Sequence, residues 1–305
     1  MTDWTRRTIG PSRRGVLAAL AGAALLATSA ACAHAGGIRG ARSGLLGVTT
    51  DVKIHYVEMG HGPGPTLLFV PGWTMTAEIW EPQIRRFGDA HRVVAIDPRA
   101  QGRSTKTGEG LYPASRARDI KAVIDRLKLA PVVLVGWSMG VSEAAMFVDQ
   151  FGTGDLAGLV LVDSSLGGDP NPERVLAVVQ WLGAVQADRA KATADFVRSM
   201  FKTPQPETYL AKVTRDALAT PSSAAVALFV GSMATSTRAA LAKIDKPTLI
   251  IHASSAASNP AYEQMRERIA GSRLERFESA GHALFVDEPD RFNRLIESFL
   301  NSLKK

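Results

Sequence analysis

Short apolar runs alternate with helical segments along most of this 305-residue chain. The clearest runs lie at residues 66–70, 132–135 and 158–162. Runs of this length are typical of strands that are buried on both faces of a parallel sheet. The segments between them are long enough to return over the sheet as helices. The alternation therefore predicts an α/β fold in which a mostly parallel sheet is covered by helices on both faces.

One long stretch interrupts the alternation. Residues 166–243 lack a strand pattern and carry apolar residues at helical spacing, and Pro204, Pro206 and Pro221 divide them into short segments. We expect four or five helices here, inserted before the last two strands as a lid over the edge of the sheet where α/β proteins bind ligands. The predicted organisation is a core of residues 36–165, a lid of residues 166–243, and a second part of the core at residues 244–305.

The first 35 residues have the pattern of an export signal. Arg13 and Arg14 precede an uncharged, alanine-rich stretch, and residues 33–35 form a small-x-small cleavage site. The arginine pair is typical of a twin-arginine signal, so the protein is expected to be periplasmic or secreted. Two less favoured alternatives are an uncleaved membrane anchor and a lipoprotein attached through Cys32, where Ser29 makes a poor lipobox.

Removing this signal changes what the charge implies. The whole chain has 36 Lys+Arg, 29 Asp+Glu and a net charge of +7. The signal contains four arginines and one aspartate, which leaves 32 basic and 28 acidic residues and a charge of +4. Such a small excess does not favour a nucleic-acid partner, and no stable membrane span is expected after signal removal. Cys32 is the only cysteine, so the mature chain has no disulfide or thiolate metal site.

The pentapeptide Gly-Trp-Ser-Met-Gly at residues 136–140 carries the strongest chemical signal. It follows an apolar run and opens a helix, which is the strand–turn–helix context of a nucleophile elbow. Gly136 and Gly140 allow the strand and the helix to pack closely around a sharp turn. The hydroxyl of Ser138 is then exposed beside the N–H groups of a helix N-terminus. Ser138 is therefore the expected nucleophile.

These motifs resemble the α/β-hydrolase family, in its esterase, C–C hydrolase and cofactor-free haloperoxidase branch. The resemblance extends from about residue 45 to the C-terminus. Residues 69–73 are similar to the family's His-Gly-x oxyanion loop, with Pro71 in place of the histidine. Residues 97–104 are similar to its Asp-x-Arg-Gly-x-Gly-x-Ser segment, with alanine for the first glycine. The resemblance implies an α/β-hydrolase fold with a Ser–His–acid triad.

A serine needs a base to remove its proton and donors to hold the oxyanion. His282 follows the last predicted strand in a Gly-His context like that of the family's catalytic histidine, and we expect it to be the base. The backbone N–H groups of Trp73 and Met139 are the expected oxyanion donors. The side chains of Trp73 and Trp137 are expected to shape the substrate pocket. The other histidines are assigned surface, structural or core roles.

The family's usual acid is missing from this chain. It normally stands in a Gly-x-x-Asp-x-x-x-Pro segment, where this chain has Ala256, and no carboxylate lies between Asp245 and Glu263. Some members carry the acid one strand earlier, and there this chain has Asp163. Because that strand lies beside the strand that carries the serine, we predict Asp163 as the acid. An acid-less Ser–His dyad and a non-catalytic ligand-binding protein are the alternatives.

The expected reaction is hydrolysis of a carboxylic ester or lactone through an acyl-serine intermediate. Aromatic residues of the lid favour a medium-sized hydrophobic small molecule as the substrate. Perhydrolase (haloperoxidase-like) activity and C–C bond hydrolysis are alternatives. The sequence has no dinucleotide motif and no metal-spaced cluster, so neither a cofactor nor a metal is expected. Asp97 and Arg99 are interpreted as a pair that stabilises a turn.

Overall fold

The computed structural model describes residues 37–167, 172–253 and 260–304. The predicted export signal, Cys32 and Ala256 lie outside the described residues, and export stays a prediction of the sequence. The strands are β1 Arg42–Gly47, β2 Lys53–Met59, β3 Thr66–Val70, β4 Val93–Asp97, β5 Val132–Trp137, β6 Leu156–Val162, β7 Thr248–Ala253 and β8 Arg273–Phe277. The helices outside the insertion are η1 Ala77–Trp80, α1 Glu81–Gly88, α2 Pro113–Leu127, α3 Met139–Phe151, α9 Pro260–Arg268, α10 Leu284–Asp287 and α11 Pro289–Ser302.

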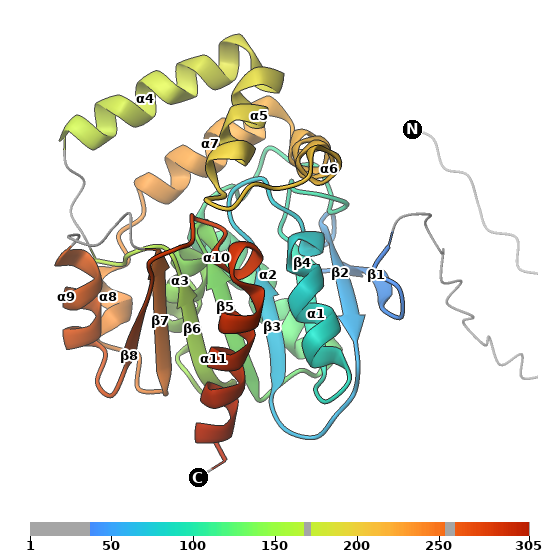
Figure 1. The fold of residues 1–305 in the computed structure, drawn as a ribbon, viewed down its shortest axis with the longest axis vertical. Helices are drawn as coiled ribbons and strands as arrows, with labels where there is room; N and C mark the ends of the chain where they lie inside the picture. Colours follow the sequence, from blue (N-terminus) through green and yellow to red (C-terminus); the bar gives the residue numbers. More distant parts are fainter. Residues whose placement is uncertain (1–36, 168–171, 254–259, 305) are drawn as a thin grey trace, which may run out of the picture. The chain divides into compact units, whose positions relative to one another are not determined.

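The eight strands form one sheet in the order β1-β2-β4-β3-β5-β6-β7-β8 (Figure 1). Strands β3 to β8 are parallel to their neighbours in this part of the sheet, whereas β2 is antiparallel to both β1 and β4. The predicted mostly parallel sheet is confirmed. After β3 the chain continues to β4, toward one edge of the sheet, whereas after β5 it continues to β6, toward the opposite edge. This reversal is the switch point at which open α/β sheets bind ligands.

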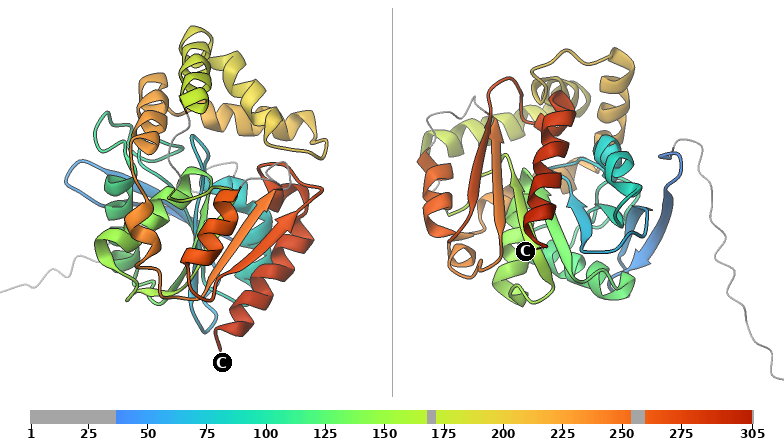
Figure 2. Two further views of the ribbon diagram at one scale, coloured as in Figure 1. Left: turned by 90° about the vertical axis from the view of Figure 1, so that its left-hand side faces the viewer. Right: turned by 60° about the horizontal axis from the view of Figure 1, so that its bottom comes forward.

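Helices cover both faces of the sheet, with α1 and α11 on one face and α2 and α3 on the other (Figures 1 and 2). Successive residues of a strand point to opposite faces. In β5, Val133 and Val135 therefore join the core beneath α1 and α11, while Val132 and Leu134 join the core beneath α2 and α3. This two-sided burial explains why the central strands are continuous apolar runs.

Five helices lie between β6 and β7: α4 Pro172–Ala187, α5 Arg189–Ser199, α6 Glu207–Leu218, α7 Ser222–Met233 and α8 Arg238–Leu241. We call them the helical insertion. The last of them returns to the core, where Leu241 is buried against the helices of one sheet face. The other four lie beyond the C-terminal ends of the strands (Figure 1). No helix in the described ranges is long and apolar enough to cross a membrane.

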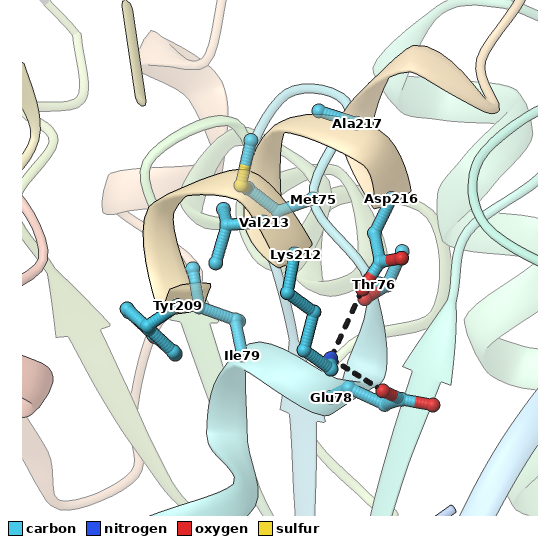
Figure 3. Close-up of a pocket in the computed structure, with 9 residues that line it drawn as sticks. All are labelled: Met75, Thr76, Glu78, Ile79, Tyr209, Lys212, Val213, Asp216 and Ala217. Carbon is cyan, nitrogen blue, oxygen red and sulfur yellow. Dashed lines mark hydrogen bonds and ion pairs between the residues drawn. The ribbon is translucent and has the colours of Figure 1, made fainter. Parts of the chain in front are cut away.

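Helix α6 is attached to the core by a cation that contacts two carboxylates. Lys212 Nζ lies 2.5 Å from Glu78 Oε2 in η1 and 3.0 Å from Asp216 Oδ2, one turn further along its own helix. Ile79 and Val213 lie in the same small pocket beside this ion pair (Figure 3). The insertion is thus held on this side by a partly exposed ion pair, an interaction usually worth less than about 1 kcal/mol, together with apolar contacts.

Candidate active site

Ser138 occupies a strained turn between β5 and α3. Its backbone has φ 56° and ψ −119°, a combination that residues with a side chain rarely adopt. A Cβ on Gly136 would lie 2.5 Å from the carbonyl oxygen of Gly140, and a Cβ on Gly140 would lie 2.5 Å from the carbonyl oxygen of Val70. Both glycines are therefore required by close backbone packing, as a nucleophile elbow demands.

The structure brings the three predicted triad residues into one hydrogen-bonded chain. Nε2 of His282 lies 2.9 Å from Oγ of Ser138, and Nδ1 of His282 lies 2.7 Å from Oδ2 of Asp163. A carboxylate only accepts hydrogen bonds, so it holds the proton of the neutral imidazole on Nδ1. Nε2 is then free to accept the proton of the serine hydroxyl.

Asp163 is fixed at the end of β6, between the ends of β5 and β7. Its backbone N–H donates to the carbonyl of Ile251 at 2.8 Å, and its Oδ1 accepts from the N–H of Ala253 at 2.8 Å. Its φ of 48° lies in the left-handed region, which aspartate tolerates better than most residues. One carboxylate oxygen is thus bound to β7, which leaves the other directed at His282.

Three hydrogen bonds hold the loop that carries His282. The N–H of Gly281 donates to Oδ2 of Asp287 at 2.7 Å, and the N–H of Ala283 donates to the carbonyl of Met200 at 2.9 Å. Nε1 of Trp137 donates to the carbonyl of His282 itself at 2.9 Å. The loop is therefore anchored to the core and also to the C-terminal end of α5 in the insertion.

The position of Trp137 corrects one expectation. Its side chain was expected to shape the substrate pocket, but Trp137 is only 1% exposed. The indole packs edge-on against Trp80 and Phe285 in the core, because it follows Val133 and Val135 on the same face of β5. Trp137 is therefore a core residue that supports the loop carrying His282.

The predicted oxyanion loop lies directly against the nucleophile. A Cβ on Gly72 would lie 2.9 Å from Cβ of Ser138 and 3.3 Å from its Oγ. Within the described part of the chain, the N–H groups of Trp73 and Met139 donate to no other backbone group in a turn, loop or cap. Both donors are thus available for a ligand beside Ser138, and their role as an oxyanion hole stays a prediction.

The side chain of Trp73 lies beneath the insertion and is only 2% exposed, so its role in shaping the substrate pocket stays a prediction. Its Nε1 donates to the carbonyl of Ala225 in α7 at 2.7 Å. The rings of Trp181, Phe196 and Phe229 surround it, with centroids 4.8, 5.2 and 5.9 Å from its own. These aromatic residues form an apolar cluster with Met139 next to the nucleophile. The surroundings of the site are accordingly hydrophobic.

Asp97 and Arg99 do not form the pair that the sequence suggested. Oδ2 of Asp97 lies 2.9 Å from Nδ1 of His55, and its Oδ1 accepts from the N–H of Ala77 at 2.7 Å. Arg99 instead makes two 2.6 Å hydrogen bonds to Asp119. Asp97 does stabilise the turn after β4, because its Oδ2 accepts the N–H of Arg103 at 2.7 Å. Arg99 has a different partner, and His55 is a buried structural residue.

The sequence analysis also missed a buried charge pair between α2 and α3. Nη1 of Arg116 lies 3.0 Å from Oε1 of Glu143, and both side chains are almost fully buried. Neither carboxylate oxygen has a well-aligned hydrogen bond among the described residues. Burial raises the pKa of Glu143 to about 7, although Arg116 opposes the rise. The sequence did contain an indication that Arg116 is buried, because it stands one turn before Ile120 on the apolar face of α2.

Glu143→Gln is expected to change how stability depends on pH. The folded chain binds the Glu143 proton more tightly than the unfolded chain, so the free energy of unfolding falls as pH rises from the ordinary pKa of 4.5 to about 7. This rise in pKa corresponds to roughly 3 kcal/mol. Denaturant unfolding at about pH 5 and about pH 8 should show that the free energy of unfolding of the variant, relative to that of the wild type, rises by about this amount between the two pH values. Parallel pH profiles of the two proteins would contradict the assignment.

A metal centre is not evident. The described ranges contain no group of three or more His, Cys, Asp or Glu side chains that could hold a metal ion.

A serine on a strained strand–helix turn, followed by a histidine after the last strand of a mostly parallel sheet, defines the α/β-hydrolase fold. The chain belongs to the Alpha/beta hydrolase family, whose model matches residues 67–295. The resemblance stated from the sequence motifs is thus confirmed.

Several known proteins are similar to this chain. The AB hydrolase superfamily protein YisY of Bacillus subtilis is 27% identical over 263 residues, which cover 82% of this chain and 96% of the relative. The non-heme chloroperoxidase CPO-A1 of Kitasatospora aureofaciens is 28% identical over 267 residues, with coverage of 82% and 96%. Among solved structures, an esterase from Exiguobacterium antarcticum superimposes with a TM-score of 0.77 at 26% identity and covers 82% of this chain and 96% of its own.

Proposed function

We propose that this protein is a serine hydrolase that cleaves a carboxylic ester or lactone. The observation that carries the proposal is the hydrogen-bonded chain from Ser138 through His282 to Asp163. The same chain of contacts argues against a protein that only binds a ligand, because binding alone would not need a histidine aligned between a hydroxyl and a carboxylate.

The geometry supports a two-step acyl transfer. Ser138 Oγ attacks the carbonyl carbon while Nε2 of His282 takes its proton, and the resulting oxyanion is held by the N–H groups of Trp73 and Met139. The intermediate collapses as His282 returns the proton to the departing alkoxide oxygen. Water, deprotonated by His282, then attacks the acyl-serine and releases the acid and the free serine. Asp163 stabilises the imidazolium that forms in each step.

The proposed substrate is a medium-sized hydrophobic small molecule. The apolar cluster around Trp73 places aromatic side chains of the insertion next to the proposed oxyanion donors. Apolar surroundings of this kind favour an apolar acyl or alcohol group by burial of its surface. The solved relative from Exiguobacterium antarcticum is an esterase, which is consistent with ester hydrolysis.

Perhydrolase activity is the second candidate. It is favoured by the likeness to the non-heme chloroperoxidase of Kitasatospora aureofaciens, which covers 82% of this chain. In that reaction hydrogen peroxide takes the place of water and attacks the acyl-serine, which yields a peracid and the free serine. No redox change at the protein is needed, so the same triad serves both reactions.

A series of p-nitrophenyl esters with acyl groups of increasing length tests the proposal. We expect release of p-nitrophenol, with kcat/KM highest for apolar acyl groups, and covalent labelling of Ser138 by a fluorophosphonate, detected by mass spectrometry. Adding hydrogen peroxide to the same assay and titrating the peracid distinguishes the second candidate from the first. A protein that hydrolyses none of the esters and stays unlabelled would be a ligand-binding member of the fold.

A further inference from the structure

The peptide that joins Gly72 to Trp73 is held by a buried glutamine. The carbonyl oxygen of Gly72 accepts a 3.1 Å hydrogen bond from Nε2 of Gln101, and the same nitrogen donates to the carbonyl of Met75 at 2.7 Å. Gln101 is fully buried. In a planar trans peptide the C=O and the N–H point in opposite directions. Holding the carbonyl of Gly72 therefore fixes the direction of the N–H of Trp73.

Arg116 determines which way the amide of Gln101 faces. Nη2 of Arg116 donates to Oε1 of Gln101 at 3.0 Å. A guanidinium has donors only, so the amide oxygen must face it and the amide nitrogen must face the two loop carbonyls. A flipped amide would set its oxygen against those carbonyls and its nitrogen against the cation. By fixing the orientation of the Gln101 amide, the guanidinium of Arg116 thus helps to hold the oxyanion loop in place.

The same guanidinium also contacts the side chain of Met139, the residue that carries the second proposed donor. Nη1 of Arg116 lies 3.2 Å from Sδ of Met139, the residue after Ser138. Glu143 supplies the countercharge from one turn further along α3. Arg116 therefore packs against the side chain of Met139 and acts on the backbone of the oxyanion loop only through Gln101.

We propose that Gln101 and Arg116 are positioning residues that hold one oxyanion donor, the N–H of Trp73, in place. The proposal rests on the proposed function, since it takes the N–H groups of Trp73 and Met139 as donors to the oxyanion. Neither side chain touches the reacting atoms. Their effect is on the alignment of this N–H, which matters in the transition state and not in substrate binding.

The main test is Gln101→Met. Loss of a whole oxyanion donor costs about 10²- to 10³-fold in kcat, so misalignment of one donor is expected to lower kcat by about 10- to 100-fold. KM for a p-nitrophenyl ester should stay within about threefold, because an interaction specific to the transition state is lost.

The chain offers a closely matched control in Gln150. Its Nε2 also donates to two backbone carbonyls, of Ala114 and Met146, and its Oε1 also accepts from an arginine, Arg118. This second cluster is on the exposed surface of α2 and α3. Gln150→Met should leave kcat within about twofold of the wild type, because it removes the same bonds without touching the oxyanion loop.

A second variant tests the role of the cation. Arg116→Met alone would leave Glu143 buried without its partner, so the pair is removed together as Arg116→Met/Glu143→Leu. We expect kcat to fall by about as much as in Gln101→Met, because both changes act through the same amide. Combining all three substitutions should then cost no more than the larger of the two losses.

The outcomes separate this inference from the proposed function. If the wild type hydrolyses esters and Gln101→Met keeps kcat within about threefold, only the inference is overturned. An equal loss in Gln150→Met, or losses that multiply in the triple variant, would overturn it as well. A wild type that neither turns over esters nor labels at Ser138 overturns the proposed function, and the inference with it.

Discussion

Asp163→Asn should lower kcat by about 10⁴-fold, because it imposes the wrong tautomer on His282. Oδ1 of Asp163 accepts the N–H of Ala253 at 2.8 Å, and an asparagine must keep its carbonyl oxygen in that place. Its NH2 group then faces Nδ1 of His282, where Oδ2 now lies at 2.7 Å. Nδ1 becomes the acceptor, Nε2 carries the proton, and the ring can no longer accept a proton from the serine.

The fold should survive this substitution. Asparagine shares the tolerance of aspartate for the left-handed region that residue 163 occupies, with φ 48°. Turnover of a p-nitrophenyl ester and thermal unfolding, measured on the same preparation, separate catalysis from stability. Adding Ala256→Asp, at the position where the family pattern has its acid, should restore part of the rate. A loss of less than about tenfold, or about 1.4 kcal/mol, would show that Asp163 is not the acid.

Ser138→Ala should lower kcat by at least about 10⁴-fold and abolish labelling by a fluorophosphonate. Alanine keeps the Cβ, so the strained backbone at φ 56° is unchanged. In the described part of the chain the hydroxyl is bonded to His282, and one hydrogen bond contributes only about 1 kcal/mol to stability. The variant should therefore fold and unfold like the wild type.

Ser142→Ala is the matched control for this prediction, since Ser142 lies one turn further along α3 and is also partly buried. It should retain wild-type turnover and labelling. Comparable activity in Ser138→Ala and the wild type would contradict a covalent mechanism at this serine.

The sheet and the elbow were predictable because they depend on local patterns. A strand that is buried on both faces must be a continuous apolar run, and β5 reads as one up to Gly136. The prediction of Asp163 as the acid required one further inference, namely that β6 lies beside β5. That step was available because consecutive strands of an α/β sheet are usually neighbours.

Other features depend on contacts between distant segments. His55 and Asp97 are paired across β2 and β4, and no local pattern in either strand indicates the partner. Gln101 contacts Gly72 and Arg116 only because the loops after β3 and β4 and helix α2 converge. Trp137 is different, because the alternation of Val133, Val135 and Trp137 already indicated a core position. The motif around Ser138 suggested a pocket instead.

The attachment of the helical insertion limits how freely this part of the chain can be exchanged between relatives. The carbonyl of Ala225 binds the indole of Trp73, and the carbonyl of Met200 binds the N–H beside His282. Both contacts come from the insertion, and each one holds a loop that carries a proposed catalytic group. A chimera with a foreign insertion would lose alignment of the base and the oxyanion loop together unless these two carbonyls were reproduced. We therefore expect substrate range and catalytic geometry to change together when the insertion is replaced, so an exchange designed to alter the first must preserve these two contacts.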